Sequence, residues 1–512
     1  MLIKTFGCAV YGIHAMPITV EVNIGDGRVG YHLVGLPDNA IKESYLRIET
    51  ALKNTGFAFP RKKVVVNMAP ADVRKEGSSY DLTIAVALLA ASDQVPSEEI
   101  EKYLIMGELS LDGSLLPITG ALPIAIQAKK EGFKGFILPK QNANEAAIVA
   151  GLDVLGAEHL NQVINFFQGG DELERIEVDT RKEFQDSYDA FDIDFSDVQG
   201  QENIKRALEI AAAGGHNIIL IGPPGAGKTM LAKRLPTILP PLTLQEALET
   251  TKIHSVAGKL TDHLGLVAQR PFRSPHHTIS DVALVGGGTN PQPGEISLAH
   301  HGVLFLDELP EFKRTVLEVL RQPLEERRVS ISRARMAVDF PASFMLIASM
   351  NPCPCGYFNH PDKECTCAPG LVQKYLSRIS GPLLDRIDIH IEVTPVKFEE
   401  LSATRKSELS KNVRERVIQA RAIQQERYKE SPQVFSNAML PNNQVRELCQ
   451  VGTAGEKLLQ TAMEKLGLSA RAYDRILKVS RTIADLAGSD DIKVEHLAEA
   501  IHFRSLDKEV WG

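Results

Sequence analysis

The chain has 512 residues, of which 44% are hydrophobic and 24% charged, and its formal net charge is −8. This composition excludes a disordered chain and a surface coated throughout with nucleic acid, although it permits a local basic channel. The longest uninterrupted apolar stretch, residues 84–91, is too short to cross a bilayer. The first twenty residues lack the pattern of a signal peptide, so we expect a cytoplasmic protein with no membrane partner.

Strand and helix patterns alternate in the first third of the chain. In order, they are two strands around a Gly-Asp-Gly turn (18–35), a helix (39–56), a strand (62–70), a helix (80–92), a strand-rich stretch (103–118) and a helix (123–132). This order predicts an α+β domain over residues 1–170. The charged, weakly patterned residues 171–194 are typical of a linker.

Residues 195–395 contain four short apolar strands, NIILIG, GVLFLDE, SFMLIAS and IDIHIEV. Uninterrupted apolar strands are typical of a parallel sheet that is covered on both faces. Residues 396–512 have helical patterns throughout. The expected fold class is therefore α/β, with a doubly wound parallel sheet at the centre of the chain and a helical lid at its C-terminal end.

The motif GPPGAGKT lies between a strand and an amphipathic helix. Its glycines allow backbone N–H groups to cradle phosphates, Lys228 reaches the β- and γ-phosphates, and Thr229 offers a hydroxyl to Mg²⁺. Asp307 and Glu308, which end a second apolar strand, would hold Mg²⁺ and orient the attacking water. We therefore expect an ATPase that uses ATP and Mg²⁺. The expected ATP-binding residues are Gly222, Pro223, Pro224, Gly225, Ala226, Gly227, Lys228, Thr229 and Met230.

Three further segments resemble the AAA+ ATPases. Asn351 in FMLIASMNP matches the sensor-1 position, Arg386 in GPLLDRIDI the arginine finger, and Arg471 in LSARAYDRIL the sensor-2 arginine of the lid. Taken singly, each arginine is equally consistent with a surface ion pair. An arginine finger acts on the nucleotide of a neighbouring subunit, so the resemblance implies a ring, and for this family a homo-hexamer.

Residues 270–302 resemble the magnesium-chelatase-like branch of the AAA+ proteins, in which a helix-2 insert projects toward the ring pore. The Gly- and Pro-rich residues 285–295 predict no regular element. Adjacent side chains cannot face one site on a regular element, so we expect structural roles for His276 and His277.

Residues 325–344 predict a hairpin with a basic tip, which matches the pre-sensor-1 hairpin of the same branch. Guanidinium groups suit phosphate oxygens in a pore. The alternative is a solvated charged face offset by Glu325 and Glu326. The candidate DNA contacts are Arg327, Arg328, Arg333 and Arg335.

Four of the six cysteines form two C-x-C pairs, Cys353 with Cys355 and Cys365 with Cys367. Four thiolates suit a tetrahedral, structural Zn²⁺ with no position left for water. Free thiols in a reducing cytosol and a redox-labile loop are the alternatives. The other two cysteines are isolated and are expected to be packing residues.

The segment KEGSSYDL, residues 75–82, resembles the serine segment of Lon proteases, with Ser79 in the place of the nucleophile. Where the general-base lysine of that family would stand, this sequence has Leu122, which cannot accept a proton. Lys129 and Lys130 lie about two helical turns further on. We therefore expect a Lon-like domain without peptidase activity. The S-x-x-D spacing from Ser78 predicts instead that this serine caps a helix.

The order of a Lon-like domain, a chelatase-like ATPase module and a helical C-terminal domain resembles the ComM family, also called YifB-like, over nearly the whole chain. The resemblance implies a motor for single-stranded or branched DNA, as in branch migration and unwinding during recombination of incoming DNA. The residues alone predict a ring ATPase with a basic hairpin. The alternatives are the motor subunit of a magnesium-chelatase-like complex, which acts through a protein partner, and a peptide remodeller.

Overall fold

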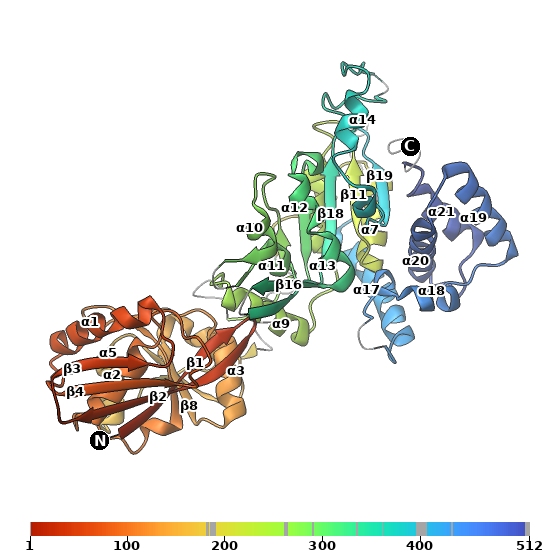
Figure 1. Ribbon diagram of the computed structural model, residues 1–512. Coiled ribbons are helices and arrows are strands. Elements are labelled where there is room, and N and C mark those ends of the chain that lie inside the picture. The colour runs from red at the N-terminus through yellow and green to blue at the C-terminus, as the bar shows by residue number, and fades with distance from the viewer. Residues whose placement is uncertain are drawn as a thin grey trace. The chain divides into compact units, whose positions relative to one another are not determined.

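The computed structural model forms two compact units (Figure 1). Unit 1 comprises residues 1–188 and 244–268, and unit 2 comprises residues 189–243 and 269–512. Within the described part of the chain, no helix is long and apolar enough to cross a membrane. The structure describes residues 2–180, 184, 191–260, 265–288, 291–333, 336–360, 362–395, 407–431 and 434–506.

Unit 1 is built on a mixed sheet of eight strands, in the order β10-β9-β8-β5-β1-β2-β4-β3. The strands that flank the Gly-Asp-Gly turn, β2 and β3, do not pair with each other. Both pair with β4, β2 antiparallel and β3 parallel. The strands are β1 (Leu2–Tyr11), β2 (His14–Gly25), β3 (Gly30–Val34), β4 (Lys63–Ala69), β5 (Tyr103–Ile105), β8 (Gly135–Pro139), β9 (Asp153–Ala157) and β10 (Glu174–Arg175), with a separate pair β6 (Glu108–Leu109) and β7 (Leu115–Leu116).

Helix α2 lies at the centre of unit 1, because every position of its apolar sequence DLTIAVALLAA is buried. The alternating pattern of the first third of the chain is confirmed. The helices of this unit are α1 (Asn39–Asn54), α2 (Asp81–Ala91), α3 (Ala121–Glu131), α4 (Ala143–Ala147), α5 (Leu160–Phe167) and the short η1 (Ile100–Lys102) and η2 (Lys140–Asn142).

One further helix of unit 1 comes from a distant part of the sequence. Helix α9 (Leu244–Val256) lies within the range that we expected for the ATPase domain, and it packs against α3. The carbonyl oxygen of Ser255 accepts a hydrogen bond from the Gly120 N–H (3.2 Å), and its hydroxyl donates to the buried Glu145. The chain thus leaves unit 2 after Thr243 and returns to it at Gln269.

Unit 2 contains a parallel sheet of five strands, in the order β12-β15-β18-β11-β19. The four apolar strands predicted from the sequence are β15, β18, β11 and β19, and the short edge strand β12 was not predicted. This order brings the carboxyl ends of β11, β15 and β18 to one edge, where the nucleotide motifs follow. The strands are β11 (Ile218–Ile221), β12 (Phe272–Arg273), β15 (Val303–Leu306), β18 (Met345–Met350) and β19 (Ile389–Glu392).

Helices surround this sheet and continue into the helical lid, as expected. Their bounds are α7 (Glu202–Gly214), α8 (Lys228–Arg234), α10 (Asp281–Val285), α11 (Glu295–Leu298), α12 (Arg314–Glu318), α13 (Arg321–Glu326), α14 (Leu371–Leu376), α15 (Gly381–Leu384), α17 (Ser410–Arg427), α18 (Asn442–Leu448), α19 (Thr453–Leu466), α20 (Ala470–Leu486) and α21 (Val494–His502), with η3 (Phe195–Asp197), η4 (Leu235–Ile238), η5 (Leu309–Glu311) and η6 (Asn437–Met439).

Two hairpins extend from unit 2. The predicted basic hairpin is present as β16 (Arg328–Arg333) paired with β17 (Met336–Pro341). In residues 285–295, where we expected no regular element, β13 (Gly286–Gly287) pairs with β14 (Gln292–Pro293). The two hairpins are neighbours, because a Cβ added to Gly286 would lie 3.2 Å from Cδ1 of Ile331.

Candidate functional site

The GPPGAGKT loop joins β11 to α8. Gly225 and Gly227 have φ of +81° and +86°, in the left-handed region where a side chain is strained. Gly222 is tightly enclosed, because an added Cβ would lie 2.2 Å from the carbonyl oxygen of Val393. The glycines of the motif are therefore needed for the path of the loop itself.

The Lys228 side chain is held across this loop. Its Nζ donates to the carbonyl oxygens of Gly222 (2.7 Å) and Pro223 (2.9 Å) and to Oδ1 of Asn351 (3.1 Å). Burial lowers the pKa of Lys228, while the charges of Asp307 and Glu308 act to raise it. The structure thus brings the P-loop lysine and the predicted sensor-1 residue into direct contact.

Oxygen donors for a cation converge beside Lys228. The Thr229 hydroxyl donates to Oδ2 of Asp307 (2.7 Å), and the Ser349 hydroxyl donates to Oδ1 of the same carboxylate. Hydroxyl and carboxylate oxygens are ligands that Mg²⁺ prefers, so these residues fit the predicted metal. Ser349 was missed in the sequence, although its place on β18, two residues before Asn351, was a usable signal.

Glu308 has a backbone φ of +55° and a side chain that is 56% exposed. Nδ1 of His277 lies 3.7 Å from its Oε2, and the His277 ring packs edge-on against Phe312. We expected only structural roles for the two histidines, and one of them lies beside the predicted water-orienting group. No spacing in the sequence indicated this neighbour.

The two predicted functional arginines have other partners in the described chain. Arg386 is 6% exposed and forms an ion pair with Glu325. Nη1 of Arg471, whose side chain is 60% exposed, lies 3.7 Å from a carboxylate oxygen of Asp385. Neither ion pair involves a P-loop residue. To act as the expected arginine finger, Arg386 would first have to leave Glu325.

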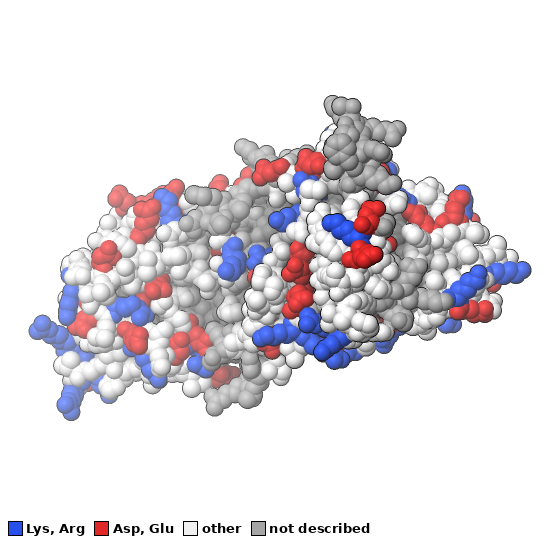
Figure 2. Space-filling model, turned by 90° about the horizontal axis from the view of Figure 1, so that it is seen from above, with Lys and Arg blue, Asp and Glu red and all other residues white. Residues whose placement is uncertain are grey.

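The four candidate DNA contacts divide into two pairs. At the base of the β16–β17 hairpin, Arg327 donates to the carbonyl oxygen of Phe344 (2.9 Å), and Arg328 forms ion pairs with Glu326 and Asp339. The side chain of Arg333 and the whole of Arg335 lie outside the described residues. On the face seen in Figure 2, basic and acidic side chains are interspersed, in keeping with the mildly acidic chain.

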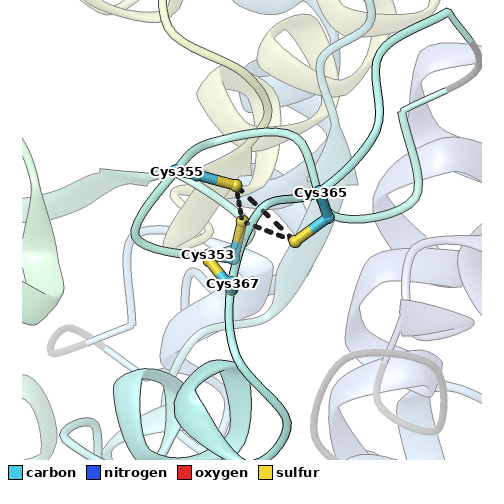
Figure 3. A group of neighbouring side chains, drawn as sticks. All are labelled: Cys353, Cys355, Cys365 and Cys367. Atoms are coloured by element: carbon cyan, nitrogen blue, oxygen red, sulfur yellow. Dashed lines mark hydrogen bonds between the residues drawn. The ribbon is translucent and has the colours of Figure 1, made fainter.

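The four cysteines of the C-x-C pairs converge on one point (Figure 3). Sγ of Cys353 lies 3.3 Å from Sγ of Cys355 and 3.8 Å from Sγ of Cys365. All four sulfur atoms lie within 4.8 Å of one another, and all four thiols are free. Tetrahedral ligation with Zn–S bonds of about 2.3 Å would place the sulfurs about 3.8 Å apart. The donor set therefore fits Zn²⁺.

The two places considered for the general base of a Lon-like site are described by the structure. Leu122 is fully buried, and its backbone N–H donates to a carboxylate oxygen of Glu145 (2.8 Å). Lys129 is turned elsewhere, since its Nζ donates to the carbonyl oxygen of Ala150 (2.5 Å). At the position of the general base, the structure has a core leucine.

The predicted helix cap at Ser78 is wrong. Helix α2 has Tyr80 as its N-cap and makes no side-chain capping bond. The Ser78 hydroxyl donates instead to Glu108, thirty residues away. The Asp81 carboxylate of the same S-x-x-D pattern accepts two hydrogen bonds from Arg47 (2.7 and 3.0 Å).

Comparisons with known proteins cover almost the whole chain. Three families match it: "Subunit ChlI of Mg-chelatase" over residues 20–142, "Magnesium chelatase, subunit ChlI" over 194–401, and "Magnesium chelatase, subunit ChlI C-terminal" over 407–504. Competence protein ComM of Haemophilus influenzae is 45% identical over 501 residues, which is 97% of this chain and 96% of that protein. The uncharacterized protein YifB of Escherichia coli is also 45% identical, over 98% of this chain and 96% of its own.

A weaker similarity is limited to part of the chain. Lon protease of Halothermothrix orenii is 27% identical over 169 residues, which is 31% of this chain and 21% of that protein. This match agrees with the Lon-like character expected of the N-terminal domain.

Proposed function

This chain belongs to the magnesium-chelatase-like AAA+ family that includes ComM and YifB, and on that premise we propose that it is a ring-forming, ATP-driven motor that acts on DNA. The AAA+ ATPase role comes with the family. The finer proposal is movement or unwinding of branched DNA during recombination of incoming strands. The observation that supports an ATP-driven motor is the convergence of Lys228, Thr229 and Asp307 at one edge of the sheet. DNA as the substrate is supported by a 45% identical relative that is named a competence protein.

Each residue of the site has a separate proposed role in ATP hydrolysis. Thr229 and Asp307 would hold Mg²⁺, which when bound supplies positive charge next to the phosphates. Lys228 pairs with the phosphate oxygens, and Asn351 fixes the position of its ammonium group. Glu308, which is exposed beside the loop, orients the attacking water and accepts its proton.

A second set of residues would act between subunits. Arg386 supplies the arginine finger once its ion pair with Glu325 opens, and Arg471 of the lid serves as the sensor-2 arginine. A finger that is supplied by a neighbour makes each site incomplete in a single chain. This arrangement supports a homo-hexameric ring.

DNA contact is assigned to the β16–β17 hairpin. Arg328 already forms ion pairs with Glu326 and Asp339, so its guanidinium group is less available to bind a phosphate. The tip residues Arg333 and Arg335 are therefore the stronger candidates. Cations that track the backbone would bind single-stranded and branched DNA with little sequence preference.

Three further assignments complete the proposal. The Lon-like domain has no peptidase activity, because Leu122 occupies the position of the proton acceptor. The four-cysteine loop binds a structural Zn²⁺. The protein works in the cytoplasm, where a reducing environment keeps such thiols available as ligands.

The test is steady-state ATP turnover of the full chain without ligand, with single-stranded DNA, with forked DNA and with an unfolded peptide, at low and moderate salt. We expect DNA to raise turnover several-fold, and the stimulation to weaken as salt screens the phosphates. Glu308→Gln should abolish turnover with every ligand. Arg333→Ala with Arg335→Ala should remove the DNA stimulation, whereas Arg446→Ala with Lys457→Ala, which removes two exposed lid cations, should not.

Turnover that is indifferent to every form of DNA would contradict a DNA motor. It would favour the motor subunit of a chelatase-like complex, the function that the matching ChlI families describe. Cleavage of the peptide by the Glu308→Gln variant would contradict an inactive Lon-like domain.

A further inference from the structure

The turn between the first two cysteines and the third lies directly against the P-loop. Gly356 has a φ of +86°, and a Cβ added to it would lie 2.5 Å from Cδ of Pro224. Pro224 is the exposed second proline of GPPGAGKT. The cysteine loop and the P-loop are therefore in contact at a point that has no room for a methyl group.

A second connection runs through Asn351. This residue bonds to Lys228 and precedes Cys353 by two positions. Its backbone is hydrogen-bonded to the side chain of Tyr375, a buried residue of α14 that follows the cysteine loop. The loop thus begins and ends at groups that contact Asn351, and its middle contacts Pro224.

Besides the cysteines, the described part of this loop is held by short-range contacts of His360, whose Nδ1 accepts from the Asp362 and Lys363 N–H groups, and of the Tyr357 ring. Between the end of β18 at Met350 and the start of α14 at Leu371, the described residues form turns and bends but no helix or strand. The Phe358 N–H donates to Sγ of Cys353 (3.3 Å), the kind of bond that stabilises a thiolate. Four thiolates this close repel one another unless a cation lies among them.

We infer that the four-cysteine loop is a zinc-dependent brace of the P-loop, and that the ion at this site sets the affinity for ATP. Zn²⁺ fixes the positions of Cys353 and Cys355, and through them Gly356 against Pro224 and Asn351 against Lys228. Loss of the ion releases both contacts. The inference rests on the ATP-binding part of the proposed function and is independent of DNA.

The test measures zinc content and ATP affinity in the full chain, with no DNA present. Metal analysis of the purified protein should give one zinc per chain. Stripping with a mercurial and a chelator, followed by restoration of Mg²⁺, should weaken binding of a fluorescent ATP analogue about tenfold, because the loss of one hydrogen bond to a charged group lowers affinity by about that factor. Added Zn²⁺ should restore the affinity. Cys365→Ser should behave as stripped protein, and Cys365→His should keep the metal and the affinity.

Substitutions at two glycines of the same loop distinguish a loss of the contact with the P-loop from a general loss of folding. Gly370 has a φ of +80° and open space around its Cα, so Gly370→Ala introduces the same backbone strain as Gly356→Ala without the clash. We expect Gly356→Ala to retain its zinc and to bind ATP several-fold more weakly. Gly370→Ala should match the wild type in both properties.

An unchanged affinity for ATP in stripped protein that is still folded by circular dichroism would overturn the inference, and so would purified protein that neither contains nor binds zinc. If stripping unfolds the chain, the two glycine variants provide the test instead. Equal ATP affinities of Gly356→Ala and Gly370→Ala would then overturn the inference that the cysteine loop braces the P-loop. Failure of DNA to stimulate turnover would leave all these outcomes unaffected, so the two proposals fail separately.

Discussion

Each unit contains a buried lysine, close to the start of a helix, that donates to backbone carbonyl oxygens. In unit 1, Nζ of Lys75 bonds to the carbonyl oxygens of Gly35 (3.0 Å) and Pro70, and in unit 2 Lys228 bonds to those of Gly222 and Pro223. Burial lowers the pKa of both. The surroundings differ, because Lys75 is fully buried and its bonds are to backbone carbonyl oxygens, whereas Lys228 lies beside Asn351 and the Thr229–Asp307 pair.

The difference teaches that a buried ammonium group is not by itself a sign of catalysis. At Lys75, the bonds to carbonyl oxygens satisfy the hydrogen-bond donors of a buried ammonium group. At Lys228, the same bonds hold the ammonium group among other groups that can bind a phosphate and its metal. The chemistry belongs to the convergence of side chains at one edge of the sheet and not to the lysine alone.

The largest expected effect sharpens this comparison at Lys228. Lys228→Ala should lower ATP turnover by about 10²-fold or more, because it removes a preorganised cation from the phosphate site. The melting temperature should also fall modestly, because the buried carbonyl oxygens of Gly222 and Pro223 lose their donor. Lys233→Ala, on the exposed side of the same helix, is the matched control and should retain turnover. Turnover of Lys228→Ala within twofold of the wild type would remove the distinction between the two lysines.

A second effect tests the convergence itself. Ser349→Ala removes the hydroxyl that donates to Asp307, and loss of a group that orients a metal ligand costs about 10- to 100-fold in metal affinity or activity. We expect about tenfold more Mg²⁺ to be needed for half-maximal turnover. A Mg²⁺ titration of Ser349→Ala, with the exposed Ser377→Ala as control, measures it. An unchanged titration would show that Asp307 needs no such support.

At Lys75 we expect an effect on stability and not on turnover. Lys75→Met keeps the length of the side chain but leaves the part-buried carbonyl oxygens of Gly35 and Pro70 without their charged donor, at a cost of about 1–3 kcal/mol in the free energy of unfolding. Chemical denaturation monitored on the unit 1 transition measures this loss. Loss of basal ATP turnover in the folded variant would break the comparison, since it would make Lys75 functional.

The smallest expected effect concerns pH. Burial raises the pKa of Glu145, so the folded chain binds this proton more tightly than the unfolded chain. The contribution to stability therefore grows as pH falls through the raised pKa toward the ordinary value of about 4.3. Glu145→Gln, which can still accept from Leu122 and Ser255, should lose this pH dependence. Thermal unfolding between pH 7.5 and 5 checks it, and Glu98→Gln at an exposed position should behave as wild type.

Local motifs made much of the fold predictable. The P-loop and the apolar strands β11, β15, β18 and β19 are continuous in sequence, so their patterns identify them. The cysteine spacing likewise predicted the convergence of the four sulfurs. Features that depend on distant residues were missed. The Ser78 hydroxyl bonds to Glu108 and not to its own helix, and the neighbours of Glu308 and Arg386 come from other elements.

Helix α9 shows most clearly why sequence patterns do not predict which distant elements pack together. Its residues lie between the P-loop helix and β12, and nothing in their composition indicates that they pack with unit 1. Only the fold shows the bond of Ser255 to Glu145, 110 residues earlier in the chain.

This path of the chain bears on how the protein could have been assembled in evolution. A domain that is joined at one linker can be exchanged between proteins by a single recombination at that linker. Unit 1 here includes residues 244–268, which are encoded inside the ATPase module. A gene cut at the linker would separate α9 from the α3 surface that buries it. The Lon-like fold and the ATPase therefore form one interlaced piece of sequence, which offers a reason why the two stay together in one chain.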